Sequence, residues 1–84
     1  MKKEVRILGL LVSNRNKEVA HVQEVLTNYG CFIKTRLGLH NVSEDECSPT
    51  GLIILELMGD QDGMDKLENK LKSIEGVNVQ KMIF

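Results

Sequence analysis

The chain has 84 residues, of which 42% are hydrophobic and 27% are charged, and its formal net charge is -1 at pH 7. This length suits one small domain over residues 1–84, and the composition is typical of a globular protein and argues against a disordered one. There is no basic stripe and only 4% of the residues are aromatic, so we expect no direct nucleic-acid binding.

The first predicted element is a strand over residues 5–12 (VRILGLLV), a run of aliphatic and β-branched residues too short for a buried helix. Arg6 interrupts the run and no small-residue cleavage site follows, so we do not interpret it as a signal peptide. No stretch approaches the ~18–20 apolar residues that cross a bilayer. Cys31 and Cys47 do not suggest a disulfide framework, and we expect a cytoplasmic protein with reduced thiols.

A helix is predicted next, with N-cap side chains offered by Ser13 and Asn14 and an end at Gly30. Its apolar residues recur at helical spacing: Val19, Val22, Leu26 and Tyr29. Residues 31–40 (CFIKTRLGLH) alternate as a strand does. One face of that strand would carry Ile33, Thr35, Leu37 and Leu39. Residues 41–50 are polar and acidic and hold the only proline, which predicts a loop.

The third predicted strand covers residues 51–58 (GLIILELM), and a turn over 59–63 supplies aspartates that can cap a second helix. The apolar stripe of that helix is Met64, Leu67, Leu71 and Ile74. Gly76 ends it, and residues 77–84 form the fourth strand. With right-handed crossovers, this order predicts an α+β, ferredoxin-like βαββαβ sandwich: a four-stranded antiparallel sheet with two helices on one face.

The two strands expected at the centre of this sheet are apolar on both faces. In the first, Val5, Ile7 and Leu11 oppose Leu8, Leu10 and Val12; in the third, Ile53, Leu55 and Leu57 oppose Leu52, Ile54 and Met58. Two helices can shelter only one face, so we expect a homo-oligomer, a dimer or tetramer, that forms through the sheet. The alternative is that long charged side chains cover the patch: Lys34, Arg36, Glu56 and Lys81.

No pattern in the sequence points to catalysis, so we expect the protein not to be an enzyme. Nothing places a base beside a cysteine or serine, and Gly9 stands alone in a strand instead of in a phosphate-binding loop. Asp60 and Asp62 resemble part of a calcium loop, but Asn69 does not fit its pattern, and helix capping explains these aspartates better.

Two classes of ligand remain open from the residues alone. Residues 13–16 collect hydrogen-bond donors before a helix, whose first amides favour anions, although simple capping also explains them. The alternative is a transition-metal site using His40, at a strand end, and Cys47, beyond a bend. No C-x-x-C or H-x-x-x-H pair forms a local chelate, so the two residues can equally be a strand-end histidine and a loop cysteine. Otherwise no cofactor is expected.

The chain resembles the regulators of the iron-only hydrogenase system. The resemblance rests on Val12-x-x-Arg15-x-Lys17, Arg36-x-Gly38, the run Leu52 to Leu57, and Lys70-Leu71-x-x-Ile74-x-Gly76-Val77-x-Val79. These proteins are similar to ACT domains and to the C-terminal domain of the nickel-responsive repressor, which oligomerise through their sheets and bind effectors near the interfaces. The resemblance therefore implies an ACT-like regulatory domain linked to hydrogenase expression or maturation. Transcriptional regulation is one role of this kind.

Two features depart from the nickel-responsive repressor. His40 has no second histidine two residues away, and no ribbon-helix-helix segment for DNA binding is present. Control of transcription would therefore act through a partner regulator protein. The residues that we expect to bind a small effector are Asn14, Arg15, Arg36 and His40. The rival functions are a metal sensor or chaperone that uses His40 and Cys47, and a purely structural adaptor.

Overall fold

The computed structural model describes the backbone of residues 4–13, 16–42 and 47–84, and their side chains apart from those of 16–17, 39–42 and 47–50. The elements are β1 (Arg6–Val12), α1 (Asn16–Asn28), a short 3-10 helix η1 (Gly30–Phe32), β2 (Ile33–Val42), β3 (Cys47–Leu57), α2 (Gln61–Lys72) and β4 (Val77–Ile83). Within this described part, no helix has both the length and the apolar character needed to span a bilayer.

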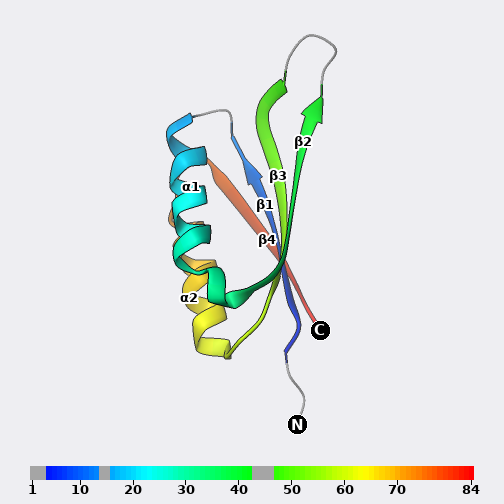
Figure 1. The fold of residues 1–84 in the computed structure, drawn as a ribbon, viewed down its shortest axis with the longest axis vertical. Coiled ribbons are helices and arrows are strands. Elements are labelled where there is room, and N and C mark those ends of the chain that lie inside the picture. The colour runs from blue at the N-terminus through cyan, green and yellow to red at the C-terminus, as the bar shows by residue number, and fades with distance from the viewer. Residues whose placement is uncertain (1–3, 14–15, 43–46) are drawn as a thin grey trace.

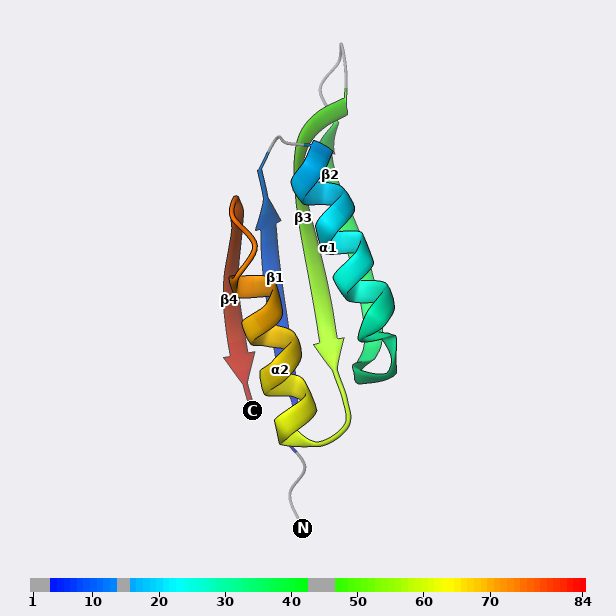
Figure 2. The same ribbon diagram turned by 90° about the vertical axis from the view of Figure 1, so that its left-hand side faces the viewer.

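The four strands form one antiparallel sheet in the order β2-β3-β1-β4. Both helices lie on the same side of the sheet, and no described residue forms a helix on the other side (Figure 1). Seen from the helical side, α2 covers β1 and β4 while α1 lies over β3 and β2 (Figure 2). The predicted α+β ferredoxin-like sandwich is therefore confirmed.

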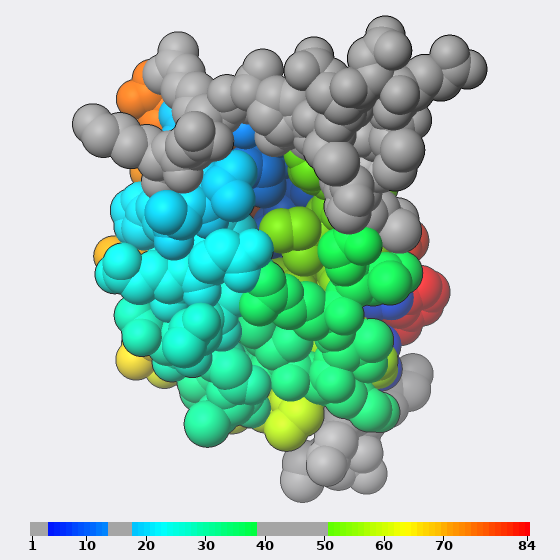
Figure 3. Space-filling view, turned by 45° about the horizontal axis from the view of Figure 1, so that its top comes forward, coloured from blue at the N-terminus to red at the C-terminus, as the bar shows by residue number. Residues whose placement is uncertain are grey.

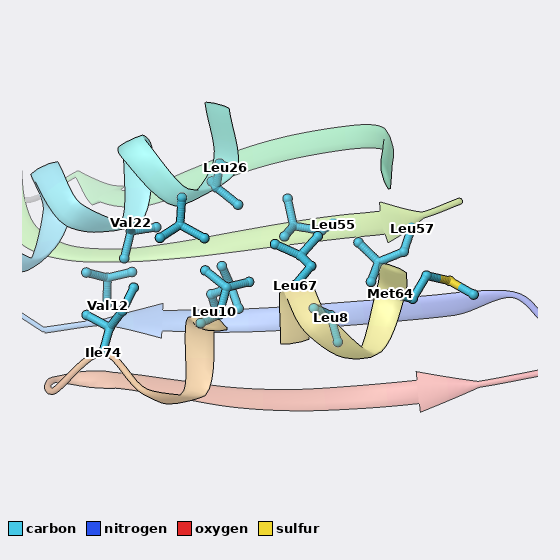
Figure 4. Packing of buried hydrophobic residues seen from close by; sticks show 12 residues of the cluster. Leu8, Leu10, Val12, Val22, Leu26, Leu55, Leu57, Met64, Leu67 and Ile74 are labelled. Atoms are coloured by element: carbon cyan, nitrogen blue, oxygen red, sulfur yellow. The ribbon is translucent and has the colours of Figure 1, made fainter. Parts of the chain in front are cut away.

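The hydrophobic core fills the space between the helices and one face of the sheet (Figure 4). β1 contributes its alternate residues, and the predicted stripe of α2 is buried along its whole length. The buried apolar side chains are Leu8, Leu10, Val12, Val22, Val25, Leu26, Leu55, Leu57, Met64, Leu67, Leu71 and Ile74. In α1 the predicted stripe is partly wrong: Val25 is buried, whereas Val19 is 37% exposed, because the buried face runs through Val22, Val25 and Leu26.

The turn into α2 is fixed by a capping interaction and by close aromatic packing. The carboxylate of Asp60 accepts a 2.7 Å hydrogen bond from the backbone N–H of Gly63, which confirms the capping interpretation of this aspartate. The ring of Phe32 packs directly against Gly63, where a Cβ atom would lie only 2.1 Å from Cε1 of the ring. Glycine is therefore required at position 63 because the ring occupies the space of a side chain.

The β2–β3 hairpin is longer than predicted, and the loop expected over residues 41–50 is wrong for 41–42 and 47–50, which are strand. β1 ends at Val12, opposite Gly51, so the outer part of the hairpin extends beyond the rest of the sheet (Figure 1). Pro49 is tolerated there because the register of the hairpin shifts between His40 and Val42 and no β1 residue pairs with this part of β3. At the other end, residues 31–32 belong to η1 and not to the strand.

Candidate functional site

The side of the sheet that carries no helix, which we call the helix-free face, is composed of three rows of side chains. Directly paired residues share a face, so the register defines these rows from β2 through β3 and β1 to β4. They are Leu52, Leu11 and Asn78; then Leu37, Ile54, Gly9 and Gln80; then Thr35, Glu56, Ile7 and Met82. Met58 and Val5 continue the face beyond the third row.

The helix-free face exposes a large apolar surface. Six of its side chains are between 37% and 55% exposed: Val5, Leu11, Leu37, Leu52, Met58 and Met82. Together they leave on the order of 500 Å² of apolar area, which is near the upper end of the patches that monomers carry. The predicted division of Leu8, Leu10 and Val12 from Ile7 and Leu11 is confirmed, since the first three are buried under the helices.

The charged side chains that could have covered this patch mostly lie elsewhere. Lys81 bonds to Glu68 of α2 and Arg36 bonds to Gln23 of α1, so both extend toward the helical side. Glu56 lies on the helix-free face, where it accepts a 3.0 Å hydrogen bond from the hydroxyl of Thr35 and lies 3.7 Å from Nζ of Lys34. Within the described residues, these charges stand at one corner of the face and leave its centre apolar.

Of the residues expected to bind an effector, the structure describes the backbone of His40, at one end of the sheet, and the side chain of Arg36. Val12 pairs with Gly51, and Gly51 pairs with His40, so the end of β1 and the backbone of His40 lie in one row. Asn14 and Arg15, which follow β1, fall outside the described residues, as does the side chain of His40.

Arg36 is the one member of the expected set whose side chain is described. It is exposed, and its guanidinium donates to the side-chain oxygen of Gln23. The contact joins β2 to α1, whose surfaces meet in Figure 3. Arg36 therefore lies on the helical side of the sheet, farther from the sheet end than His40.

The expected metal ligands lie on neighbouring strands. Val42 pairs with Cys47 and His40 pairs with Gly51, so both candidate residues belong to the outer part of the β2–β3 hairpin, while their side chains are outside the described set. Among the described residues, no three histidine, cysteine or acidic side chains gather as a metal site would require. Cys31, a free thiol, is exposed in η1, away from this hairpin end.

A buried charge cluster between the sheet and α2 was not predicted. Arg6 is 2% exposed, and its guanidinium lies 2.9 Å from Oε1 of Glu68 and 2.8 Å from the carboxylate of Asp65. The other carboxylate oxygen of Glu68, Oε2, lies 2.8 Å from Nζ of Lys72 and 3.0 Å from Nζ of Lys81. The interruption of an apolar strand by Arg6, in phase with Leu8 and Leu10, was the only sequence signal of this cluster.

This cluster changes the ionisation of its central carboxylate. Burial by itself would raise the pKa of Glu68, but the hydrogen bonds and charges of Lys72 and Lys81 outweigh it and lower that pKa. The pKa of Arg6 is raised, because hydrogen bonds to Asp65 and Glu4 outweigh the effect of burial. Both shifts favour the charged forms of Arg6 and Glu68. The cluster connects α2 to β1 and β4, which indicates a structural role.

The junctions at the end of β1 and the start of β4 also contact each other. The backbone N–H of Ser13 donates to the carbonyl of Gly76 at 2.9 Å, and the Ser13 hydroxyl donates to Glu18 at 2.8 Å. Gly76 has a φ of 85°, a left-handed conformation that favours glycine. These contacts hold the start of α1 beside the turn that follows α2.

Comparison with known families gives a match over most of the chain. The TM1266-like family, described as "Iron-only hydrogenase system regulator, putative", matches residues 4–81. Among solved structures, the uncharacterized protein TM1266 from Thermotoga maritima is 31% identical with a TM-score of 0.82. That alignment covers 98% of this chain and 99% of the other. No curated protein matches the sequence.

More distant structures share the fold. The ACT domain from GTP pyrophosphokinase of Chlorobium tepidum is 16% identical with a TM-score of 0.65, covering 93% of this chain and 96% of that one. CPII, a nitrogen regulatory PII-like protein from Thiomonas intermedia K12, is 12% identical with a TM-score of 0.56, covering 98% and 93%. At these identities the likeness shows an ACT-like fold and nothing further.

Proposed function

Because the chain belongs to the TM1266-like family, whose description names regulators of the iron-only hydrogenase system, we propose that it is a non-catalytic regulatory domain. It acts as a homo-oligomer that forms through the helix-free face of its sheet, and it responds to a small effector or to a partner regulator protein. Its effect on the hydrogenase system then passes through that partner, since a sequence with a net charge of -1 and no basic stripe is poorly suited to binding nucleic acid directly.

The observation that carries this proposal is the apolar area of the helix-free face. Standard protein interfaces bury about 800 Å² on each partner, with an apolar core and a polar rim. About 500 Å² of exposed apolar side chains, flanked by Thr35, Glu56, Asn78 and Gln80, matches that composition. A second copy offers the same surface, so it is the simplest occupant of this face.

Sedimentation velocity across a range of protomer concentrations tests the self-association. Leu11 lies on central strand β1, inside the apolar part of the face, and is 48% exposed. We expect the wild-type chain to sediment as a dimer or larger, and Leu11→Glu to shift it to protomers, because a charge would be buried without a partner. Val19→Glu is the matched control, since Val19 is 37% exposed on α1, outside the face.

A wild-type chain that sediments as a protomer at every micromolar concentration would contradict the proposed assembly. So would a Leu11→Glu variant that stays as associated as the Val19→Glu control, provided that circular dichroism shows both variants to be folded.

Effector binding is supported by the end of the sheet, where the last residue of β1, Val12, and the backbone of His40 lie in one row, with Arg36 farther along β2. CPII, with the same fold, is bound to ADP, AMP and bicarbonate in its structure. ADP, AMP and bicarbonate are therefore suitable first probes. A rise in the melting temperature that is lost in Arg15→Ala and kept in Lys66→Ala, an exposed lysine of α2, is the expected result.

The same protein also serves to distinguish the metal alternative from effector binding. Metal analysis of an untagged preparation would show bound nickel, zinc or iron, lost on His40→Ala or Cys47→Ala, if the chain were a metal sensor or chaperone. Unchanged melting temperatures with every nucleotide, anion and metal would instead favour a structural adaptor and would overturn the effector part of the proposal.

A further inference from the structure

Among the residues whose side chains the structure describes, the polar residues of the helix-free face occupy two opposite corners. Thr35 and Glu56, with the ammonium group of Lys34, form the corner over β2 and β3. Asn78 and Gln80 on β4 form the other corner, diagonally across the sheet. Between the corners runs an apolar band, from Leu37, Leu52 and Leu11 to Ile7 and Met82, with Gly9 near its middle.

Two copies that meet face to face with two-fold symmetry can place the axis in two ways relative to this pattern. An axis that runs along the polar corners brings Glu56 of one copy opposite Glu56 of the other, because Glu56 lies close to that line. Facing like charges in a buried interface disfavour this arrangement. An axis that runs along the apolar band exchanges the corners, so that each acidic corner meets an amide corner.

We propose, on the basis of the self-association proposed above, that the two-fold axis of the homodimer follows the apolar band and places Gln80 of each copy against Glu56 of the other. The amide group of Gln80 then donates to the carboxylate of Glu56. Asn78 of each copy then lies beside Thr35 and Lys34 of the other, and the apolar bands of the two copies cover one another.

The spacing of a β-sheet fixes how the strands cross in this dimer. Neighbouring strands are about 4.8 Å apart, and successive residues on one face are about 6.8 Å apart along a strand. The band crosses the four strands over about three rows, so it runs at about 45° to them. A two-fold axis along it makes the strands of the two sheets cross at nearly right angles, which is the orthogonal class of sheet packing.

Gly9 suits the centre of this contact. It lies on central strand β1, between Ile54 and Gln80, and a Cβ built on it would meet no atom closer than 3.9 Å. Packing within one copy therefore leaves room for a side chain at this position. Because Gly9 has no side chain, the backbone of β1 is open at this position to a side chain of the second copy.

A charge-exchange cycle followed by sedimentation equilibrium tests the orientation. In the proposed dimer, Gln80→Glu sets two carboxylates against each other twice, and we expect the dimer dissociation constant to rise by about ten-fold or more. Adding Glu56→Gln restores the original amide–carboxylate contact with the partners exchanged, so the double variant should return to the wild-type constant. Glu24→Gln, on the exposed outer side of α1, serves as the charge control.

The opposite orientation predicts a different result. With the axis along the polar corners, Glu56 faces Glu56 and Asn78 faces Asn78, while position 80 meets neither of them. The effects of Gln80→Glu and Glu56→Gln would then be additive, with no specific rescue in the double variant, and Glu56→Gln alone would strengthen the dimer. That result would overturn the proposed axis while leaving self-association intact. A wild-type chain that sediments only as protomers would overturn the proposed function itself, so the two failures are distinguishable.

Cross-linking gives a second measurement that does not depend on electrostatics. In a chain carrying Cys31→Ser and Cys47→Ser, the pair Glu56→Cys and Gln80→Cys should be joined between copies by a short bismaleimide. Either cysteine alone should give little cross-linked dimer. Efficient cross-linking of Glu56→Cys alone would contradict the proposed orientation.

Discussion

The replacement Gly63→Ala sets helix propensity against packing. Position 63 lies in the first turn of α2, where alanine in place of glycine normally stabilises a helix by about 0.5–1 kcal/mol. Here, however, the new Cβ would lie 2.1 Å from Cε1 and 2.5 Å from Cζ of Phe32. The ring cannot move away freely, because its other side packs against the core and Gly59 lies directly beside it.

Overpacking of this kind costs about 1–3 kcal/mol, which exceeds the gain in propensity. We therefore expect Gly63→Ala to destabilise the chain by about 1–2 kcal/mol net, and each kcal/mol lowers the melting temperature by about 4–8 °C in a domain of this size. Thermal and urea unfolding should be measured at one fixed protomer concentration, since an oligomer gains stability with concentration.

Two variants make the test specific to the ring. Gly30→Ala, at a position where a Cβ meets nothing within 4 Å, should leave stability unchanged or raise it slightly. In a Phe32→Leu background, Gly63→Ala should lose most of its cost, because the atoms that clash are absent. A higher melting temperature for Gly63→Ala in the otherwise wild-type chain would refute the packing argument.

Two further predictions concern the charge cluster and the turn after α2. Glu68→Gln should lower the free energy of unfolding by about 3 kcal/mol at neutral pH, because Arg6, Lys72 and Lys81 lose a buried partner. Since folding lowers the pKa of Glu68, its carboxylate stabilises the fold at pH values above the ordinary glutamate pKa, and this stabilisation is lost as the pH falls through the lower folded pKa. The difference in the free energy of unfolding between the wild-type and Glu68→Gln chains, measured in urea, should therefore shrink in acid. Gly76→Ala should destabilise by about 1–3 kcal/mol in the same assay, because of its φ of 85°, and an equal melting temperature would contradict the requirement for glycine.

Much of the fold follows from patterns that are local in the sequence. The stripe of α2 and the alternation in β1 depend on spacing alone, so both could be assigned without knowing what packs against them. The extension of β2 and β3 into residues 41–42 and 47–50 could not, because polar residues and Pro49 suggest a loop. There the long hairpin overrides composition, since its outer end has no neighbouring strand that a proline would disrupt.

The candidate site was predicted less completely. The apolar character of both faces of the sheet could be inferred, because Leu8 and Ile7 point to opposite faces of β1 and the helices can cover only one of these faces. The contact between Arg6 and Glu68 joins residues that are far apart in sequence and share no motif, so no spacing rule could pair them. The diagonal distribution of polar corners likewise requires the register of all four strands, which the sequence does not reveal. For His40, the structure adds the position of the backbone and leaves its role a prediction.

The strand order has a consequence for how the chain acquires its structure during synthesis. β1 is made first, yet it pairs only with β3 and β4, through residues 51–56 and 77–83. Until those residues leave the ribosome, an aliphatic segment remains without the neighbours that satisfy its backbone, and the β2–β3 hairpin is the first pairing open to the nascent chain. Acquisition of the native sheet is thus delayed until residues 77–83 have left the ribosome, and β1 is open to non-native contacts in the interval.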